Sequence, residues 1–171
     1  AKTITSTNSD VTLTAWDIDL AGTASLTAGD NAITIHGAES AQTIGLGSTA
    51  KNMHVTDGAL GRVTAGAGLT VGSSTSGSID FSGLTPATTD AINPIYLMGT
   101  KSTSILEVGS ASVFNKGFTL TTALGLKLSE SLTTSTSTMM INTGTGTLTL
   151  VASKTLSSTN QIILITADDF D

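Results

Sequence analysis

Apolar residues along this chain occur in pairs two positions apart, the spacing of side chains on one face of a β-strand. Val11 and Leu13 return as Ile33 and Ile35 at an offset of 22 (33 minus 11), and then as Met53 and Val55 at an offset of 20 (53 minus 33). Similar offsets join Phe118/Leu120 to Met139/Ile141 (139 minus 118 is 21) and Leu126/Leu128 to Leu148/Leu150 (148 minus 126 is 22). The pattern predicts a structural rung of about 20 to 22 residues, with ladders such as Val11, Ile33 and Met53 pointing inward.

Further short apolar segments lie between these pairs and are separated by turn sequences. The segments are "IDLAG", "ASLTAG", "SIDF", "IYLM" and "SILEV", and the turns include "AGD", "TDG", "TGTG" and "SSTSG". Each rung then holds about three short strands. This predicts an all-β chain folded as a parallel β-helix, or β-solenoid. A β-sandwich is the alternative, but a sandwich has no reason to repeat at the interval of these rungs.

A second and longer repetition connects the two ends of the chain. Residues 1–19, "AKTITSTNSDVTLTAWDID", return in altered form as residues 153–171, "SKTLSSTNQIILITADDFD", always 152 positions later. The shared residues include Lys2/Lys154, Thr7/Thr159, Asn8/Asn160, Thr14/Thr166, Ala15/Ala167, Asp17/Asp169 and Asp19/Asp171. We expect residues 1–152 to form one long repeat unit of about seven coils and residues 153–171 to begin the next. Such a unit would advance a rod by roughly 34 Å, and the chain would be a piece of something longer.

Residues 82–103, "SGLTPATTDAINPIYLMGTKST", are the least regular stretch and hold both prolines. Proline lacks the N–H that a strand ladder needs. Pro86 and Pro94 therefore predict a loop that bulges from one coil.

Composition agrees with a β-rich chain and excludes some partners. Charged residues make up 12% and hydrophobic residues 39%, with a mean hydropathy of +0.26, which argues against disorder. The net charge is −6, and the seven Lys and Arg residues are scattered, so nucleic acid and anionic lipid are not expected partners. There is no cysteine, no apolar run long enough for membrane insertion and no signal-peptide pattern. If the protein is exported, we expect its signal outside this sequence.

The stretch "ITIHGAESAQTIGLGSTAKNMHVTDGALGRVTAGAGLTVGSSTSGSIDFSG" follows "LTAWDIDLAGTASLTAG" in the chain. Together with the closing "ITADDFD", it resembles the tandem repeats of filamentous-haemagglutinin-like surface proteins. The resemblance covers roughly residues 9–83 and the C-terminal segment. It implies a secreted, right-handed parallel β-helix used as a rod, and it implies no catalytic residues.

Candidate metal ligands are few. His36 and His54 are 18 positions apart (54 minus 36) and could lie on neighbouring coils, but two histidines without a nearby carboxylate or cysteine do not make a zinc site. The aspartates of "WDID" and "ADDFD" alternate in the manner of calcium ligands, but they lack the glycine-rich repeat of calcium-binding β-rolls. We predict no metal ligand, no cofactor and no cofactor-binding residue.

Catalysis is not expected either, so no catalytic residue is predicted. No Gly-x-Ser-x-Gly turn places a serine near a base. A polysaccharide-active β-helix enzyme would need clustered carboxylates, yet Glu39, Glu107 and Glu130 are spread along the chain and Arg62 is the single arginine. Trp16 and Tyr96 are the candidates for stacking on a sugar.

Ice binding is a sharper alternative because threonines recur at outward positions. Thr12, Thr34, Thr119 and Thr149 each lie between two inward residues, and flat ranks of threonine could order water. The same outward slot also holds His54, Asp80 and Lys127, which would break such a rank. Threonine is in addition a good strand residue in its own right.

The favoured function is structural. We expect a module of a long extracellular repetitive fibre or adhesin at the cell surface, with coils that stack end to end on further copies of the same repeat. An ice-binding or glycan-binding solenoid is the alternative, and a polysaccharide-active enzyme comes third.

Overall fold

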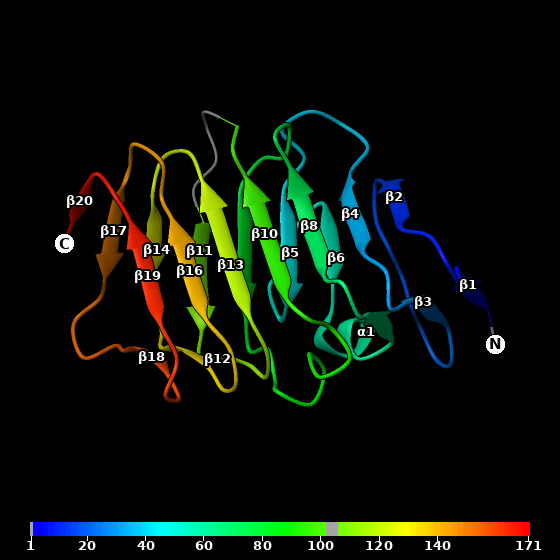
Figure 1. Cartoon of the computed structure of the whole chain (residues 1–171). Coiled ribbons are helices and arrows are strands. Elements are labelled where there is room, and N and C mark those ends of the chain that lie inside the picture. Colours follow the sequence, from blue (N-terminus) through cyan, green and yellow to red (C-terminus); the bar gives the residue numbers. More distant parts are fainter. Residues whose placement is uncertain (1, 102–105) are drawn as a thin grey trace.

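The chain is a stack of coils wound around one axis, with the N-terminus at one end and the C-terminus at the other (Figure 1). The computed structural model describes residues 2–101 and 106–171. All pairs of named strands are parallel, and the strands form three faces of a β-solenoid of about seven turns. The predicted all-β parallel solenoid is confirmed.

Sheet B forms the first face, and its seven strands follow one another in sequence order along the axis. We number the coils from 1 to 7 by these strands. They are β2 (Val11–Ala15), β4 (Ile33–Gly37), β8 (Leu69–Ser73), β10 (Ile95–Gly99), β13 (Phe118–Thr122), β16 (Met139–Asn142) and β19 (Ile163–Thr166).

Sheet C forms the second face and also has seven strands. In spatial order they are β6 (Met53–Val55), β5 (Ile44–Gly47), β9 (Ile79–Ser82), β11 (Leu106–Ser110), β14 (Leu126–Leu128), β17 (Thr147–Leu150) and β20 (Asp169–Phe170). The first two are exchanged relative to the sequence, so β6 lies at the level where coil 1 would contribute a strand.

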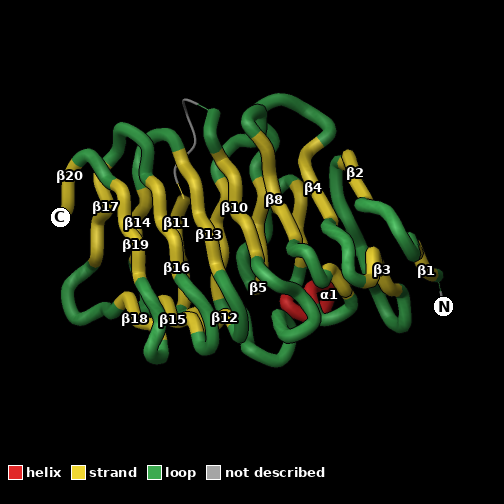
Figure 2. Tube along the Cα trace, in the orientation of Figure 1, coloured by secondary structure: helices red, strands yellow, loops and turns green. Residues whose placement is uncertain are grey.

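The third face is divided into two three-stranded sheets (Figure 2). Sheet A holds β1 (Thr3–Thr5), β3 (Ser25–Gly29) and β7 (Val63–Ala65), and sheet D holds β12 (Ser112–Phe114), β15 (Leu132–Thr134) and β18 (Leu156–Ser158). Coil 4 separates them with an irregular segment. That segment touches both neighbours, through a bridge between Ala65 and Ile92 and a hydrogen bond from Val113 N to Leu84 O.

The inward ladders follow the apolar pairs of the sequence, with one exception. Val11 and Leu13 pair with Ile33 and Ile35, and Phe118 pairs with Met139. The prediction that Met53 continues the ladder from Ile33 is wrong. Residue 33 pairs with Leu69 on sheet B, whereas Met53 pairs with Ile44 on sheet C.

An insertion in coil 2 explains this exception. After β5, the chain doubles back through residues 48–52 to add β6 beside it and then forms α1 (Asp57–Leu60). The doubling back is tight, because a Cβ atom at Gly45 would clash with Thr49 O. Thr56 caps α1 by accepting a hydrogen bond from Ala59 N at 3.1 Å. The sequence "TDG" is therefore the start of a helical turn and not a simple bend.

Coil length depends on such insertions. Register partners on sheet B differ in sequence number by 22 from Val11 to Ile33 (33 minus 11) and by 21 from Phe118 to Met139 (139 minus 118), as predicted. From Ile33 to Leu69 the difference is 36 (69 minus 33). As a result, the offset of 152 between Val11 and Ile163 (163 minus 11) corresponds to six strand-to-strand steps on sheet B, not the seven coils expected.

The loop predicted for residues 82–103 is shorter than expected. Pro86 and Pro94 lie outside the strands, in the irregular segment of coil 4. However, Ser82 ends β9, and β10 takes residues 95–99 because Ile95 and Leu97 point into the core. Residues 102 and 103 lie outside the described residues.

Three phenylalanines fill the core near this segment, one from each face. Phe81 comes from β9, Phe114 from β12 and Phe118 from β13, and all three are buried. The ring centroids of Phe114 and Phe118 are 4.4 Å apart, and Phe81 lies 5.9 and 5.7 Å from them. The cluster ties the three faces together where the third face changes from sheet A to sheet D.

Candidate functional site

The outer face of sheet B is the most distinctive surface of the molecule. Alternate residues of each strand point outward, so two ranks of side chains run along the axis. Strand register places Thr12, Thr34, Thr70, Tyr96, Thr119, Met140 and Leu164 in one rank. The second rank holds Thr14, His36, Gly72, Met98, Thr121, Asn142 and Thr166.

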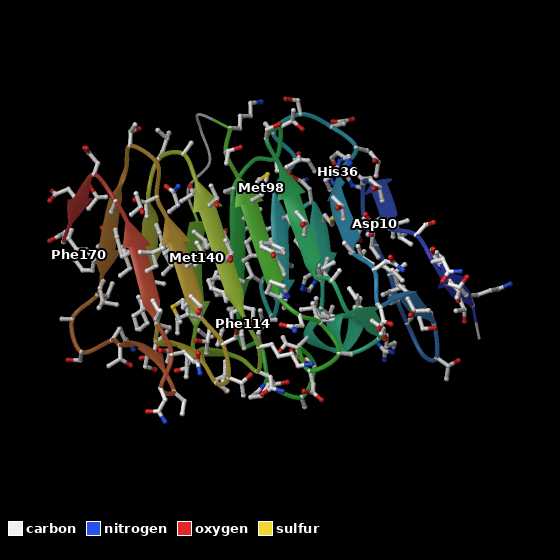
Figure 3. The ribbon with its side chains drawn as sticks, viewed as in Figure 1. Asp10, His36, Met98, Phe114, Met140 and Phe170 are labelled. Carbon is white, nitrogen blue, oxygen red and sulfur yellow. The ribbon has the colours of Figure 1, made fainter. Side chains whose placement is uncertain are left out.

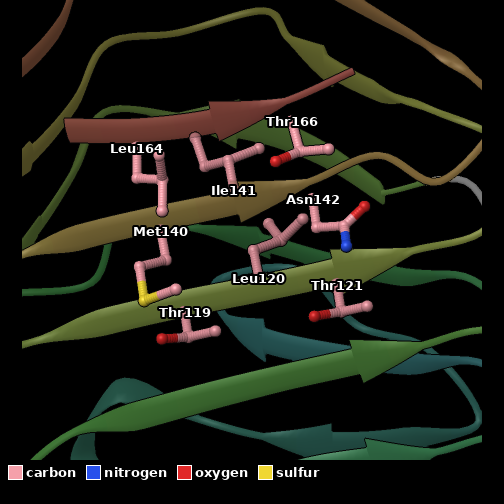
Figure 4. A pocket seen from close by; sticks show the side chains of 8 residues that line it. All are labelled: Thr119, Leu120, Thr121, Met140, Ile141, Asn142, Leu164 and Thr166. Atoms are coloured by element: carbon pink, nitrogen blue, oxygen red, sulfur yellow. The ribbon is translucent and has the colours of Figure 1, made fainter. Parts of the chain in front are cut away.

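None of these described positions holds Asp, Glu, Lys or Arg, although the chain carries a net charge of −6. The half of the face that is nearer the C-terminus exposes large apolar side chains. Met140 is 42% and Leu164 50% exposed, and they are neighbours on β16 and β19 (Figures 3 and 4). They border a shallow hollow of about 140 Å3, whose other walls include Thr119, Asn142 and Thr166. The face is therefore uncharged and partly apolar.

The four threonines predicted to form one rank lie on two different faces. Thr12, Thr34 and Thr119 do share one rank on sheet B, but Thr149 lies on β17 of sheet C and pairs with Lys127. The three residues expected to interrupt the rank, His54, Asp80 and Lys127, also lie on sheet C. On sheet B the threonines are interrupted by Tyr96, Met140 and Leu164 instead.

The outer face of sheet C is polar and partly covered. Residues 48–52 fold over β5, and Lys51 forms an ion pair with Asp80, whose side chain is nearly buried. Backbone register through residue 107 adds Lys127 to the same rank. The charges that the sequence showed at outward positions are thus gathered on this face.

The two histidines lie on different faces and each is held by a local hydrogen bond. His36 on β4 bonds Gly37 O through Nδ1 at 3.1 Å and Thr14 Oγ1 through Nε2 at 3.0 Å. Because a carbonyl only accepts, Nδ1 carries a proton. His54 on β6 donates from Nε2 to Gly47 O at 2.9 Å. The two side chains therefore lie on different sheets and do not stack on neighbouring coils, which was the arrangement considered for a shared metal.

Two of the aspartates considered as calcium ligands accept hydrogen bonds from backbone N–H groups. Asp17 Oδ1 accepts from Ile18 N at 2.9 Å and from His54 N at 2.8 Å. Asp169 Oδ1 accepts from Phe170 N at 2.8 Å. Across the residues that the structure describes, no group of three or more His, Cys, Asp or Glu side chains is placed to hold a metal ion.

Four residues weighed for catalysis or sugar stacking, Arg62, Glu130, Trp16 and Tyr96, lie on different coils. Arg62 donates to Leu20 O and Gly22 O at the start of coil 2, and Glu130 forms an ion pair of 2.7 Å with Lys154 on the next coil. Trp16 is 52% and Tyr96 37% exposed, but they belong to coil 1 and coil 4. These side chains stabilise the junctions between coils or stand alone.

The two copies of the nineteen-residue segment adopt matching local structures. Ser6 Oγ donates to Ser9 O at 2.7 Å, and Ser158 Oγ donates to Gln161 O at 2.6 Å. The same match holds for the bonds from Asp17 and Asp169 to the next residue. The first two strands also correspond, because β1 and β18 lie on the third face and β2 and β19 on sheet B, whereas β20 has no counterpart strand in the described part of residues 1–19. The sequence could have shown the turn, since Ser6 and Ser158 are separated by the same offset as the other repeated residues.

Comparisons with protein-family models, with curated proteins and with solved structures gave no match for this chain. In the part of the chain that is described, no helix has the length and apolar character needed to cross a membrane.

Proposed function

We propose that the chain is a structural module of a long extracellular repetitive fibre or adhesin, built to extend a rod by stacking coils. The observation that carries the proposal is the match between coil 1 and coil 7. Residues 153–171 repeat the two strands, the serine-bonded turn and the aspartate-bonded corner of residues 1–19, six steps further along the axis. A fold that returns to its starting conformation can continue without limit.

The physical basis is the ladder arrangement of the solenoid. Each added coil pairs its backbone with the previous one and buries further inward residues, as Phe118, Met139 and Ile163 do in succession. Burial stabilises by about 25 cal/mol per Å2 of apolar surface. Stability then grows with the number of coils, and stiffness comes from the continuous sheets.

The resemblance to filamentous-haemagglutinin-like repeats supports the extracellular location and the rod function. In this proposal the partner of the module is further copies of the same repeat, and the uncharged face of sheet B is a surface for contact with other fibre components. Neither nucleic acid nor membrane is a partner.

Electron microscopy and fibre diffraction of the native assembly test the proposal. Filaments should give a strong axial reflection near about 4.8 Å, the spacing between strands, and a modulation of about 29 Å from six such steps per unit. Globular particles without the axial reflection would contradict the fibre function.

Ice binding is the second candidate, because the charges expected among the outward threonines are absent from their face. Thr12, Thr34 and Thr70 form an uninterrupted, in-register row on sheet B. A measurement of thermal hysteresis separates the two functions. Activity that is lost in the variant Thr34→Lys and kept in Thr149→Lys, on the other face, would favour ice binding.

A further inference from the structure

We infer that coil 7, residues 153–171, is a docking surface for a copy of the second coil, residues 20–62, carried by the following unit of a continuous chain. The inference rests on the proposed fibre function and specifies how two units join. It excludes a fibre in which coil 1 of a separate copy docks on coil 7.

The first argument is the set of contacts by which coil 2 holds coil 1. Gln42 Nε2 donates to two carbonyls at the corner of coil 1, Ala15 O at 3.3 Å and Trp16 O at 2.5 Å. The backbone N–H of His54 donates to the carboxylate of Asp17 at 2.8 Å. These bonds come from the insertion and corner of coil 2, so a regular coil would not supply them.

Other contacts extend the junction on both sides of this corner. Arg62, at the end of coil 2, donates from Nη1 to Leu20 O at 2.8 Å and from Nε to Gly22 O at 2.9 Å, and so holds the residues at which the chain leaves coil 1. On sheet B, the pairs Val11 with Ile33 and Leu13 with Ile35 fix the register. Coil 2 thus recognises coil 1 by apolar pairing, by two corner carbonyls and by one carboxylate.

Coil 7 presents the same recognition features. Ala167 and Asp168 occupy the positions equivalent to Ala15 and Trp16, and Asp169 repeats Asp17 in residue type and in its bond to the next N–H. Ile163 and Ile165 occupy the positions equivalent to Val11 and Leu13, and like them they are half-buried and point inward. Among the described residues, β19 pairs with β16 alone, which leaves one edge for a further strand.

One acceptor is missing from coil 7. Asp10 accepts a hydrogen bond from Ala32 N at 2.9 Å, but the corresponding residue is Ile162. The docking surface therefore keeps the corner and the ladder of coil 1 and lacks this single bond.

Charge argues against direct stacking of coil 1 on coil 7. Equivalent positions would face each other at the strand spacing of about 4.8 Å. Asp17 would then lie opposite Asp169, and Asp19 opposite Asp171. Like charges directly opposite each other on neighbouring strands are destabilising. If coil 2 of the following unit docks there instead, its residue equivalent to His54 places a backbone N–H, and not a carboxylate, beside Asp169.

The test compares the 171-residue chain with an extended chain, in which residues 1–171 are followed directly by residues 20–152. Hydrogen–deuterium exchange is measured at Ile163–Thr166, a segment that occurs once in each protein. We expect exchange there to be at least about tenfold slower in the extended chain, because β19 gains a second neighbour. Unchanged exchange would overturn the inference.

Two variants of the extended chain test which aspartate of coil 7 is bound by the added copy of coil 2. Asp169→Ala should restore part of the fast exchange. Asp171→Ala should not, because its counterpart Asp19 makes no side-chain hydrogen bond or ion pair with coil 2 among the described residues. Equal effects of the two variants would contradict a specific role for Asp169. Neither variant should alter exchange in the 171-residue chain.

The oligomeric state of the 171-residue chain separates this inference from the fibre proposal. Sedimentation should show monomers at neutral pH. If separate copies instead formed filaments with slow exchange at Ile163–Thr166, coil 1 would dock on coil 7. The continuous-chain junction would then be wrong, and the fibre function would stand.

Discussion

At the scale of single residues, the position of a coil in the stack decides how much an inward side chain contributes. Ile35 in coil 2 is fully buried, whereas Leu13, its partner in coil 1, is half-buried. We expect Ile35→Asp to abolish folding, because it buries an unpaired charge and costs at least about 4 kcal/mol. Leu13→Asp should cost only about 1–2 kcal/mol, since water reaches that position.

The outward neighbour Thr12 is the matched control. It is exposed on the same strand as Leu13, so Thr12→Asp should leave the midpoint of urea unfolding nearly unchanged. Circular dichroism during urea unfolding checks all three variants. An equal loss in Thr12→Asp and Ile35→Asp would refute the assignment of inward and outward positions.

Thr134 offers a stabilising change. Its Oγ1 is buried on β15 and has no hydrogen-bond partner among the described residues. Thr134→Val keeps the shape and removes the unpaired hydroxyl, so we expect a gain of about 1 kcal/mol in the free energy of unfolding, measured by urea titration. Thr133→Val is the control, because the Thr133 hydroxyl bonds Ser157 Oγ at 2.9 Å and its loss should bring no gain.

At the scale of elements, the sequence predicts strands and their inward residues better than it predicts their faces. Phe118, Leu120, Met139 and Ile141 pair as their spacing indicates. The spacing of an apolar pair does not show which face of the solenoid its strand belongs to. Met53 and Val55 are inward as expected, yet they belong to sheet C, because the inserted strand happens to begin 20 residues after Ile33 (53 minus 33), nearly the length of a coil.

The same limit explains the threonine rank. Thr149 and Thr119 both lie between two apolar residues, and only the register shows that one is on sheet C and the other on sheet B. The recognition bonds of Gln42 and Arg62 could not be predicted at all, because they join residues 26 to 42 positions apart through backbone carbonyls. Carbonyls are present at every residue and leave no signal in the sequence.

The insertion in coil 2 depends on one glycine, which gives a test of this element. A methyl group at Gly45 would clash with Thr49 O, so Gly45→Ala should displace residues 48–52 and cost roughly 2–3 kcal/mol. Gly58→Ala is the control in α1. Its nearest neighbour would be Arg62 Nη1 at 3.6 Å, so its thermal unfolding midpoint should be unchanged or raised. Equal losses in the two variants would contradict the close approach at Gly45.

At the scale of the whole molecule, the solenoid, its three strands per coil and its rung length follow from spacing alone. The number of coils between the two copies does not follow from spacing. Six strand-to-strand steps separate the copies, and not seven, because coil 2 is longer than the others. The division of surface character, with an uncharged sheet B and a charged sheet C, needs the register of every strand. Fold class was therefore predictable, and the faces on which partners would act were not.

Strand β6 is an extra strand in sheet C, because coil 2 contributes both β5 and β6 to that sheet. In a continuous rod, seven strand spacings on sheet C would have to match six on sheet B, a difference of about 4.8 Å. With faces about 10 Å apart, β6 would act as a wedge that turns the axis by roughly 25° in each unit. Because every wedge lies on a related side, the bends would add up to a strongly curved, supercoiled filament. Tomography should show this curvature, and straight filaments would mean that β20 leaves its sheet when the next unit arrives.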